Sequence, residues 1–251
     1  MITKIIIKLR SDKMIHKAIE FAAKAHRNQV RKGSDAPYIV HPFEVAHILT
    51  ENKCSKNLII AGLLHDTVED THVEIDDIER EFGSEVAAIV AACSEDKSKS
   101  WEVRKQHTID YLGREADMDV MLLSLADKLS NLRSIKADYA VMQEEVWTRF
   151  NRPKEKQSWY YGELLDVFEP LFDYEMYWEF TDIYADLFAT YYIDKNKELI
   201  VKTNEHDYYG YSREKCKWIR DDKLKALIDN KEVSKIEKDY AVALVKQWNE
   251  E

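Results

Sequence analysis

Glycine and proline are scarce in this chain, which has 6 glycines and 4 prolines among 251 residues. These numbers are too low for a β fold rich in tight turns, and they favour helices joined by short loops. The 3 cysteines are scattered and have no Cys-x-x-Cys spacing. Such a sparse, odd-numbered set argues against a disulfide framework and favours a reducing compartment.

Two further absences concern membranes and nucleic acids. The apolar stretch at residues 1–10 is interrupted by lysines, is too short to cross a bilayer and has no cleavage-site pattern. The formal net charge of -10 argues against a general nucleic-acid-binding surface, but it leaves room for a local basic pocket that binds a phosphorylated metabolite. We therefore expect a cytoplasmic protein with no membrane and no nucleic-acid partner.

Apolar residues recur at the helical period through the first two thirds of the chain. Ser55 is in position to cap a helix, and Gly83 separates two others. Gly33, Ser34, Asp35 and Pro37 indicate a loop between the first two helices. The expected helices cover residues 12–26, 42–50, 56–66, 74–81, 84–94, a segment that begins after residue 100, and residues 119–136.

The composition changes after Pro153, where aromatic residues become frequent. They recur at spacings compatible with helices, which is typical of helix packing. Farther along, residues 198–203 and 208–211 are separated by the polar residues 204–207. This pattern is typical of a small β-hairpin.

A last helix is expected near the end of the chain, because Ser234 followed by Glu237 is a capping-box pattern. Taken together, the patterns predict an all-α fold with a C-terminal helical extension and a small β-hairpin. We expect one domain over residues 1–192 and a C-terminal appendage of unassigned role over residues 193–251.

Two positions indicate metal chemistry. His65 and Asp66 follow the apolar residues 58–64, and an adjacent imidazole and carboxylate can bind one divalent cation. Asp127 follows another apolar run, and burying its charge costs several kcal/mol unless it is paired or bound to metal. His26, at the end of the first long helix, completes a set of two histidines and two carboxylates, which suits Mn²⁺, Fe²⁺ or Zn²⁺.

Each of these residues also has an ordinary structural interpretation when it is taken alone. His26 would then be a cation at a helix C-terminus, and Asp127 would pair with a buried lysine or arginine. The sequence around them favours the metal site. Four ordered segments resemble one family: His26-Arg-Asn-Gln-Val-Arg31-Lys32, Pro37-Tyr38-Ile-Val-His41-Pro42, Leu63-Leu-His65-Asp66-Thr-Val-Glu69-Asp70-Thr71 and Leu125-Ala-Asp127-Lys-Leu-Ser-Asn131-Leu132.

These segments resemble the HD hydrolase domain of the RelA/SpoT family, and they are most like its small stand-alone hydrolases of the metazoan SpoT homologue type. Residues 153–161 also resemble a segment of the bacterial members, and the resemblance fades after about residue 192. The resemblance implies a metallohydrolase with a divalent cation, commonly Mn²⁺, with Fe²⁺, Zn²⁺ or another divalent cation as alternatives. It implies four metal ligands: His26, His65, Asp66 and Asp127.

Glu69 and Asp70 match the acidic pair that orients or deprotonates the attacking water in this family. If the helix continues through them, Glu69 lies four residues after His65 and Asp70 lies four residues after Asp66, so the acids share a face with the ligands. A solvated acidic helix end is the competing interpretation. Carboxylates at a helix C-terminus oppose the helix dipole, however, and this favours a nearby cation.

The resemblance also implies five substrate contacts: Arg31, Lys32, Tyr38, Lys97 and Asn131. Arg31, Lys32 and Lys97 would receive phosphates and Asn131 would contact the nucleoside. Tyr38 and His41 would shape the pocket wall, with a supporting or structural role equally plausible for His41. The loop before Lys97 departs from the family, because Ser94-Glu95 replaces the Thr-Asp usual in the small hydrolases.

The activity implied by the resemblance is removal of pyrophosphate from the 3′ position of guanosine 3′,5′-bis-pyrophosphate (ppGpp), giving GDP, or GTP from the pentaphosphate. Two alternatives stay open. One is the same chemistry on another nucleotide, such as the 2′-phosphate of NADPH. The other is a non-catalytic nucleotide-sensing or interaction module whose aromatic C-terminal half binds a partner.

Overall fold

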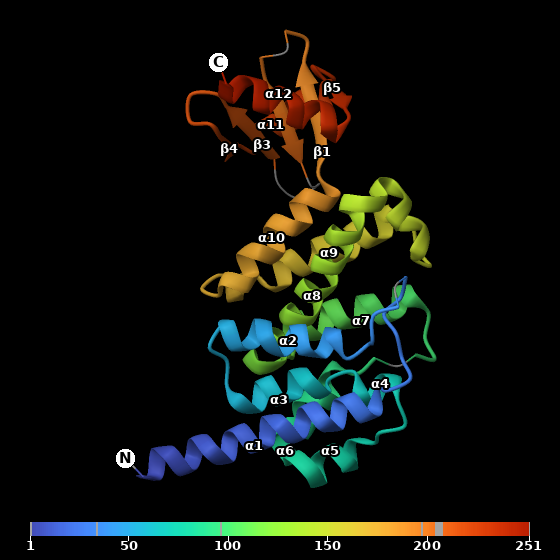
Figure 1. Ribbon diagram of the computed structural model, residues 1–251. Coiled ribbons are helices and arrows are strands. Elements are labelled where there is room, and N and C mark those ends of the chain that lie inside the picture. Colours follow the sequence, from blue (N-terminus) through green and yellow to red (C-terminus); the bar gives the residue numbers. More distant parts are fainter. Residues whose placement is uncertain (1, 34, 96, 197, 204–207, 251) are drawn as a thin grey trace. The chain divides into compact units, whose positions relative to one another are not determined.

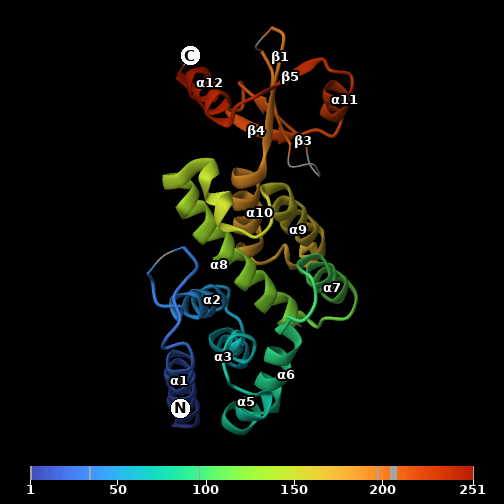
Figure 2. The same cartoon turned by 90° about the vertical axis from the view of Figure 1, so that its right-hand side faces the viewer.

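The computed structural model describes residues 2–33, 35–95, 97–196, 198–203 and 208–250, with side chains from residue 13 onward (Figures 1 and 2). The chain forms two compact units that divide between Thr181 and Asp182, which is earlier than the expected domain boundary after residue 192. Within the described residues, no helix combines the length and the apolar character needed to span a membrane.

The N-terminal unit is helical, as the sequence predicts. Helix α1 starts before the expected N-terminus near residue 12, and α8 extends beyond the expected end at residue 136. The elements are α1 (Ile2–Ala25), α2 (Val40–Glu51), α3 (Lys56–Leu64), α4 (Thr67–Asp70), α5 (Ile75–Phe82), α6 (Ser84–Cys93), α7 (Trp101–Arg114), α8 (Met118–Met142), the 3₁₀ helix η1 (Gln143–Arg149), α9 (Lys154–Val167), the 3₁₀ helix η2 (Glu169–Leu171) and α10 (Glu175–Phe188), which crosses the boundary between the units.

Helix α3 is the centre of this unit, and every one of its residues from Leu58 to Leu64 is buried. Helices α1, α2, α6 and α8 pack around it, and Figure 2 shows it nearly end-on among them. Its N-terminus is capped as predicted, because Ser55 Oγ accepts the Leu58 N–H at 3.1 Å. Gly62 allows a close approach to α2, since a Cβ there would lie 2.8 Å from Leu49 Cδ1.

The chain breaks after α3 instead of continuing as one helix through the acidic residues. Helix α3 ends at Leu64, and the Thr67 hydroxyl donates to the Leu64 carbonyl at 2.7 Å. Asp70 N–H then donates to the Asp66 carbonyl at 2.9 Å, which closes the single turn α4. His65 and Asp66 therefore lie at a bend between two helices. The single uninterrupted helix that was expected to place Glu69 and Asp70 on the same face as His65 and Asp66 is not formed.

The C-terminal unit is not helical throughout, so the all-α prediction is wrong for this part of the chain. It contains a five-stranded antiparallel sheet with the order β4-β3-β2-β1-β5, and the predicted hairpin is only its β2–β3 pair. The predicted turn at residues 204–207 lies outside the described residues. The elements are β1 (Thr190–Asp194), β2 (Ile200–Thr203), β3 (Tyr208–Ser212), β4 (Lys217–Arg220), α11 (Leu224–Asp229), β5 (Val233–Ile236) and α12 (Lys238–Glu250).

One sheet face carries the core of this unit. Tyr191, Ile193 and Tyr211 pack with Ala241 and Trp248 of α12. The alternation of side chains along a strand places them on the same face, as their register with the neighbouring strands requires. The last helix does begin close to its expected position, but the expected cap is wrong, because Ser234 belongs to β5 and the helix starts at Lys238.

Candidate metal centre

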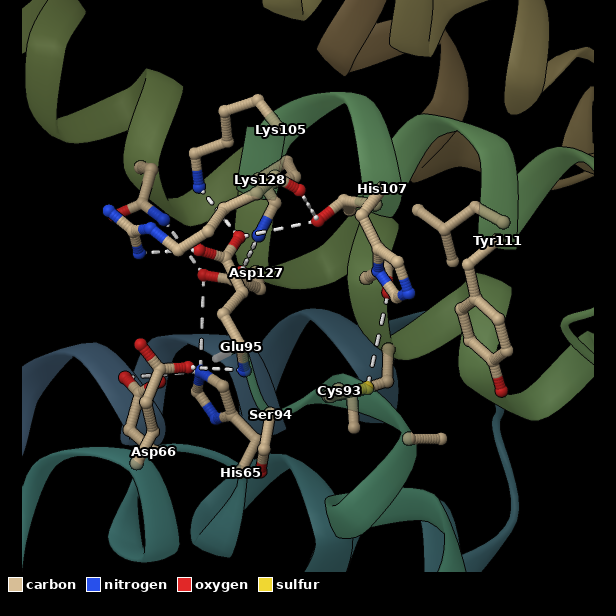
Figure 3. A pocket seen from close by; sticks show the side chains of 18 of the residues that line it. His65, Asp66, Cys93, Ser94, Glu95, Lys105, His107, Tyr111, Asp127 and Lys128 are labelled. Atoms are coloured by element: carbon tan, nitrogen blue, oxygen red, sulfur yellow. Dashed lines mark hydrogen bonds and ion pairs between the residues drawn. The ribbon is translucent and has the colours of Figure 1, made fainter. Parts of the chain in front are cut away.

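Three side chains from different parts of the N-terminal unit converge on one point. His41 comes from the first turn of α2, His65 from the bend after α3 and Asp127 from the middle of α8. One ligand atom of each lies within 4.8 Å of the other two. His41 Nε2 is 3.1 Å from Asp127 Oδ1, and His65 Nε2 is 3.9 Å from the same oxygen. Figure 3 shows His65 and Asp127 facing each other from separate elements.

Asp66 borders this group on the other side. Its Oδ2 lies 3.2 Å from His65 Nε2 and 3.5 Å from His41 Nε2. The same oxygen accepts the Tyr38 hydroxyl at 2.7 Å. Two imidazole nitrogens and two carboxylates are thus gathered in one place, which is a ligand set suited to a divalent transition metal.

The orientation of the His41 ring is set by a chain of hydrogen bonds behind it. Ser130 donates its hydroxyl proton to Glu44 Oε2 at 2.9 Å, so Ser130 Oγ can only accept from His41 Nδ1, which lies 2.8 Å away. His41 therefore carries its proton on Nδ1. Nε2 faces Asp127, in the orientation that metal-binding histidines adopt.

His65 shows the same arrangement. Its Nδ1 lies 2.8 Å from the Gly62 carbonyl, which can only accept, so the proton is on Nδ1. Its Nε2 is buried and has no hydrogen-bond partner among the described residues. A buried ring nitrogen without a hydrogen-bond partner is costly, and a cation bound to it would remove that cost.

The electrostatics of the centre favour a positive charge. Burial opposes protonation of His65, but Asp66 and Asp127 outweigh it and raise its pKa to about 9. Burial also opposes ionisation of both carboxyls, yet His65 and His41 hold the pKa of Asp66 well below its usual range, and Lys128 and His41 do the same for Asp127. Both carboxylates are therefore ionised at neutral pH, and the residues present fit a bound divalent cation.

His26, which the sequence predicts as a ligand, is not part of the converging group. It is buried, and its Nδ1 lies 2.6 Å from Gln29 Oε1, whose amide in turn donates to the Asp70 carbonyl at 2.5 Å. His41 is the second histidine of the group instead. The sequence does contain a signal for it, because a histidine directly before Pro42 belongs to the first turn of a helix and can point from a fixed backbone.

The two predicted catalytic acids lie next to the centre and are bound by the loop between α6 and α7. Glu69 Oε2 accepts the Glu95 N–H at 3.2 Å. Lys97 Nζ donates to the Glu69 carbonyl at 3.2 Å, lies 3.4 Å from Glu69 Oε1 and pairs with Asp70. Burial raises the pKa of Glu69, and the Glu95 N–H and Lys97 oppose this effect. A raised pKa suits a group that accepts a proton near neutrality.

A cavity of about 490 Å³ opens over the centre, and a second one of about 280 Å³ adjoins it. Lys105, Lys128 and Asn131 line both cavities. The second cavity also contains Lys32 and Arg152, so its wall is strongly basic. Figure 3 shows Lys105 and Lys128 beside Asp127. This arrangement can bind an anion with more than one phosphate group.

Of the five predicted substrate contacts, Lys32, Tyr38 and Asn131 line these cavities, while Arg31 and Lys97 are not among the lining residues. Arg31 donates to Asn131 Oδ1 at 3.3 Å and lies over the Tyr38 ring, 5.8 Å from its centroid. Tyr38 itself is hydrogen-bonded to Asp66 and lies 3.1 Å from Asp70 Oδ2. Lys97 pairs with the acids, as described above. Asp96, next to it in the sequence, lies outside the described residues.

The fold and the site together define a helical domain with an anionic, imidazole-containing cation centre at the bottom of a basic cavity. Comparison with known proteins is consistent with this class. The HD domain family matches residues 18–172 of the chain. The protein belongs to the HD domain family, in its RelA/SpoT branch.

Two relatives illustrate the range of that branch. The chain is 34% identical over 170 residues to a GTP pyrophosphokinase of Myxococcus xanthus, covering 63% of this chain but only 20% of the relative. It is 40% identical over 121 residues to the human guanosine-3′,5′-bis(diphosphate) 3′-pyrophosphohydrolase MESH1, covering 47% of this chain and 67% of that protein. The chain therefore spans about a fifth of the long relative and two thirds of the short one.

Two solved structures resemble the N-terminal part of the molecule. A protein from Listeria monocytogenes EGD-e is 37% identical, with a TM-score of 0.56, and covers 59% of this chain and 98% of its own. A metazoan orthologue of SpoT, described as hydrolysing ppGpp, is 27% identical, with a TM-score of 0.59, and covers 69% of this chain and 94% of its own.

Proposed function

We propose that this protein is a metal-dependent hydrolase that removes pyrophosphate from the 3′ position of ppGpp, releasing GDP, or GTP from the pentaphosphate. The observation that carries the proposal is the convergence of His41, His65, Asp66 and Asp127 beside Glu69 in a basic cavity. The activities by which the human and metazoan relatives are described support the choice of substrate.

His41, His65, Asp66 and Asp127 would hold the cation, and Mn²⁺ is our proposal for its identity because the site mixes imidazole and carboxylate ligands. When bound, such a cation acts as a Lewis acid that polarises a phosphoryl group and makes water more acidic. Its positive charge would also replace the proton that Asp66 and Asp127 otherwise favour on His65.

The reaction needs a group that accepts a proton from water, and we assign this role to Glu69, which lines the cavity over the centre and whose pKa burial raises. Water attacks the phosphorus attached to the 3′ oxygen, the bond from that phosphorus to the 3′ oxygen breaks, and pyrophosphate leaves. Glu69 takes the proton that the water loses and returns it to the 3′ oxygen, which leaves as the hydroxyl of the nucleotide. Asp70, hydrogen-bonded to Tyr38 and paired with Lys97, orients this part of the site.

The two adjoining cavities, which share Lys105, Lys128 and Asn131, suit a nucleotide that carries phosphates at two positions. One diphosphate would lie over the metal centre, where Lys128 and Lys105 offset the charge that develops on phosphorus. The other would extend toward Lys32 and Arg152 in the second cavity. Asn131, which lines both cavities and accepts from Arg31 at 3.3 Å, would contact the nucleoside, and Arg31 would receive a phosphate beside it.

The test is a panel of nucleotides incubated with the Mn²⁺-loaded protein: ppGpp, the pentaphosphate, NADPH and GDP. We expect pyrophosphate release from the first two and no turnover of GDP, with Asp127→Asn as the inactive control. Phosphate release from NADPH with ppGpp untouched would replace the substrate but keep the hydrolase. Nucleotide binding without any turnover would favour the sensing module.

A further inference from the structure

The carboxylate of Glu95, a loop residue, accepts hydrogen bonds from three side chains. Its side chain is only 15% exposed. Arg104 donates to Oε2 at 2.7 Å, while Lys105 and Thr108 donate to Oε1 at 2.7 Å and 3.3 Å. All three donors belong to α7, and Figure 3 shows Glu95 and Lys105 on the same side of the cavity. The carboxylate therefore anchors the loop after α6 to α7.

The main chain of the same residue reaches the acids. Glu95 N–H donates to Glu69 Oε2 at 3.2 Å. Two residues farther on, Lys97 donates to the Glu69 carbonyl and pairs with Asp70. The loop that contains Glu95 and Lys97 is thus hydrogen-bonded to the side chain and the backbone of Glu69 in α4. Through the Glu95 carboxylate, the same loop is hydrogen-bonded to α7.

We propose that Glu95 is a positioning residue for Glu69, an inference that rests on the proposed function. The ionised Glu95 carboxylate neutralises Arg104 and Lys105 and fixes its own backbone, and the fixed N–H holds one Glu69 oxygen. The second oxygen of Glu69, which lies 3.4 Å from Lys97 Nζ, is then held in a defined direction to take the proton from water. The residue touches neither substrate nor cation in this role.

If Glu95 has this role, its removal should lower turnover without weakening substrate binding. Removing the carboxylate frees the loop, so Glu69 loses its fixed direction, and a misplacement of about 1 Å in a reacting group costs about 10²-fold in rate. Arg104 and Lys105 remain in the cavity wall and lose their internal counter-charge. They stay available to phosphate, so KM should not rise.

The experiment compares Glu95→Ala and the milder Glu95→Gln with wild type and a matched control. Glu81→Ala is the control, because Glu81 also bridges a lysine and an arginine, Lys17 at 2.8 Å and Arg80 at 3.4 Å, and it is not among the residues that line either cavity. We measure kcat and KM for ppGpp, bound Mn²⁺ per chain, and hydrogen–deuterium exchange of peptides covering α4 and residues 94–97.

For Glu95→Ala we expect kcat to fall by about 10- to 100-fold, with KM unchanged or lower and Mn²⁺ retained. Glu95→Gln should fall between it and wild type, and Glu81→Ala should match wild type. Exchange at α4 should speed up in the Glu95 variants only. Unchanged exchange at α4, or equal losses in kcat and Mn²⁺ content, would overturn the proposal. If wild type turns over no nucleotide, the proposed function fails, while the exchange measurement still decides whether Glu95 holds α4.

Discussion

On one side of the cavity, His41 and His65 are held by buried hydrogen bonds whose direction is fixed by Ser130 and by the Gly62 carbonyl. We call His41, His65, Asp66 and Asp127 the ligand side. On the other side, the acid side, Glu69 and Asp70 are held by Lys97, whose side chain is 50% exposed.

The difference shows how one site combines two requirements. A cation centre needs donors that do not move, and neutral hydrogen bonds inside the core provide this. A group that takes and returns a proton needs partners it can release when substrate arrives, and a half-exposed ion pair is worth little enough to be exchanged. The predictions below test whether the two sides fail in these different ways.

The largest effect is expected on the ligand side, from a comparison of two buried histidines. His41→Ala should lose the bound cation and at least about 10³-fold in turnover, because it removes a ligand and its Lewis-acid chemistry. His26→Ala should keep the cation, since His26 is not part of the converging group. Metal analysis of both purified variants gives the answer. Metal loss in His26→Ala alone would restore the ligand set predicted from sequence.

The acid side should fail differently when Glu69 is changed to glutamine. Turnover should fall by about 10²- to 10⁴-fold, the usual contribution of a proton-transferring group. Bound cation should stay near one per chain, because Glu69 is outside the converging group. Kinetics and metal analysis on the same sample check both points, with Glu81→Gln as the control. A Glu69→Gln protein that lost its metal would place Glu69 on the ligand side.

A smaller effect is expected behind the ligand side. Ser130→Ala removes the acceptor that holds the His41 proton on Nδ1, and loss of such a partner weakens metal binding by about 10- to 100-fold. Chelator competition measures this affinity. Ser55→Ala is the control: it removes the cap of α3 and should cost about 1 kcal/mol of stability without changing metal affinity. Equal affinities in the two variants would contradict the role given to Ser130.

The smallest effect concerns pH and Glu95. Burial alone would raise the pKa of the Glu95 carboxyl. The positive charges of Lys105, Lys128 and Arg104 outweigh burial, so the pKa lies below its usual value of 4.5. A folded-state pKa below the unfolded value stabilises the protein at higher pH, and this contribution is lost as pH falls through the folded pKa. The difference in melting temperature between wild type and Glu95→Gln should therefore be largest near pH 7 and shrink below about pH 4. A pH-independent difference would contradict the ion-pair interpretation.

The sequence was most informative where a pattern is local. Ser55 predicts its own hydrogen bond, and the apolar run before His65 predicts a buried helix, as the structure shows. Convergence of distant side chains is different, because which histidine reaches Asp127 depends on how α2, α3 and α8 cross. The sequence patterns therefore predicted His26 as the ligand and gave His41 only a pocket-wall or structural role, and it is the packing that brings His41 to Asp127 instead.

The C-terminal sheet is difficult to predict from the sequence for a related reason. Its strands have 4 or 5 residues each, too few for an alternating pattern to stand out from a helical one. In Lys217-Trp-Ile-Arg220 the polar and apolar residues do not alternate. Which of these side chains share a face with Tyr211 is known only from the register, in which Trp218 pairs with Tyr211. Ser234 satisfies the local rule for a helix cap, yet pairing of β5 with Ile193 in β1 determines its conformation.

Gly62 has a consequence that reaches beyond packing. Its missing side chain lets Leu49 and Val45 of α2 press against α3, and its carbonyl holds the His65 ring. His41 is carried by α2, so the spacing of the two backbones sets the gap between the imidazole nitrogens. That gap would bear on the size of the cation that the centre accepts. The absence of one methyl group at Gly62 would thus contribute to the choice among divalent ions through the spacing of the helices, without a change in any ligand.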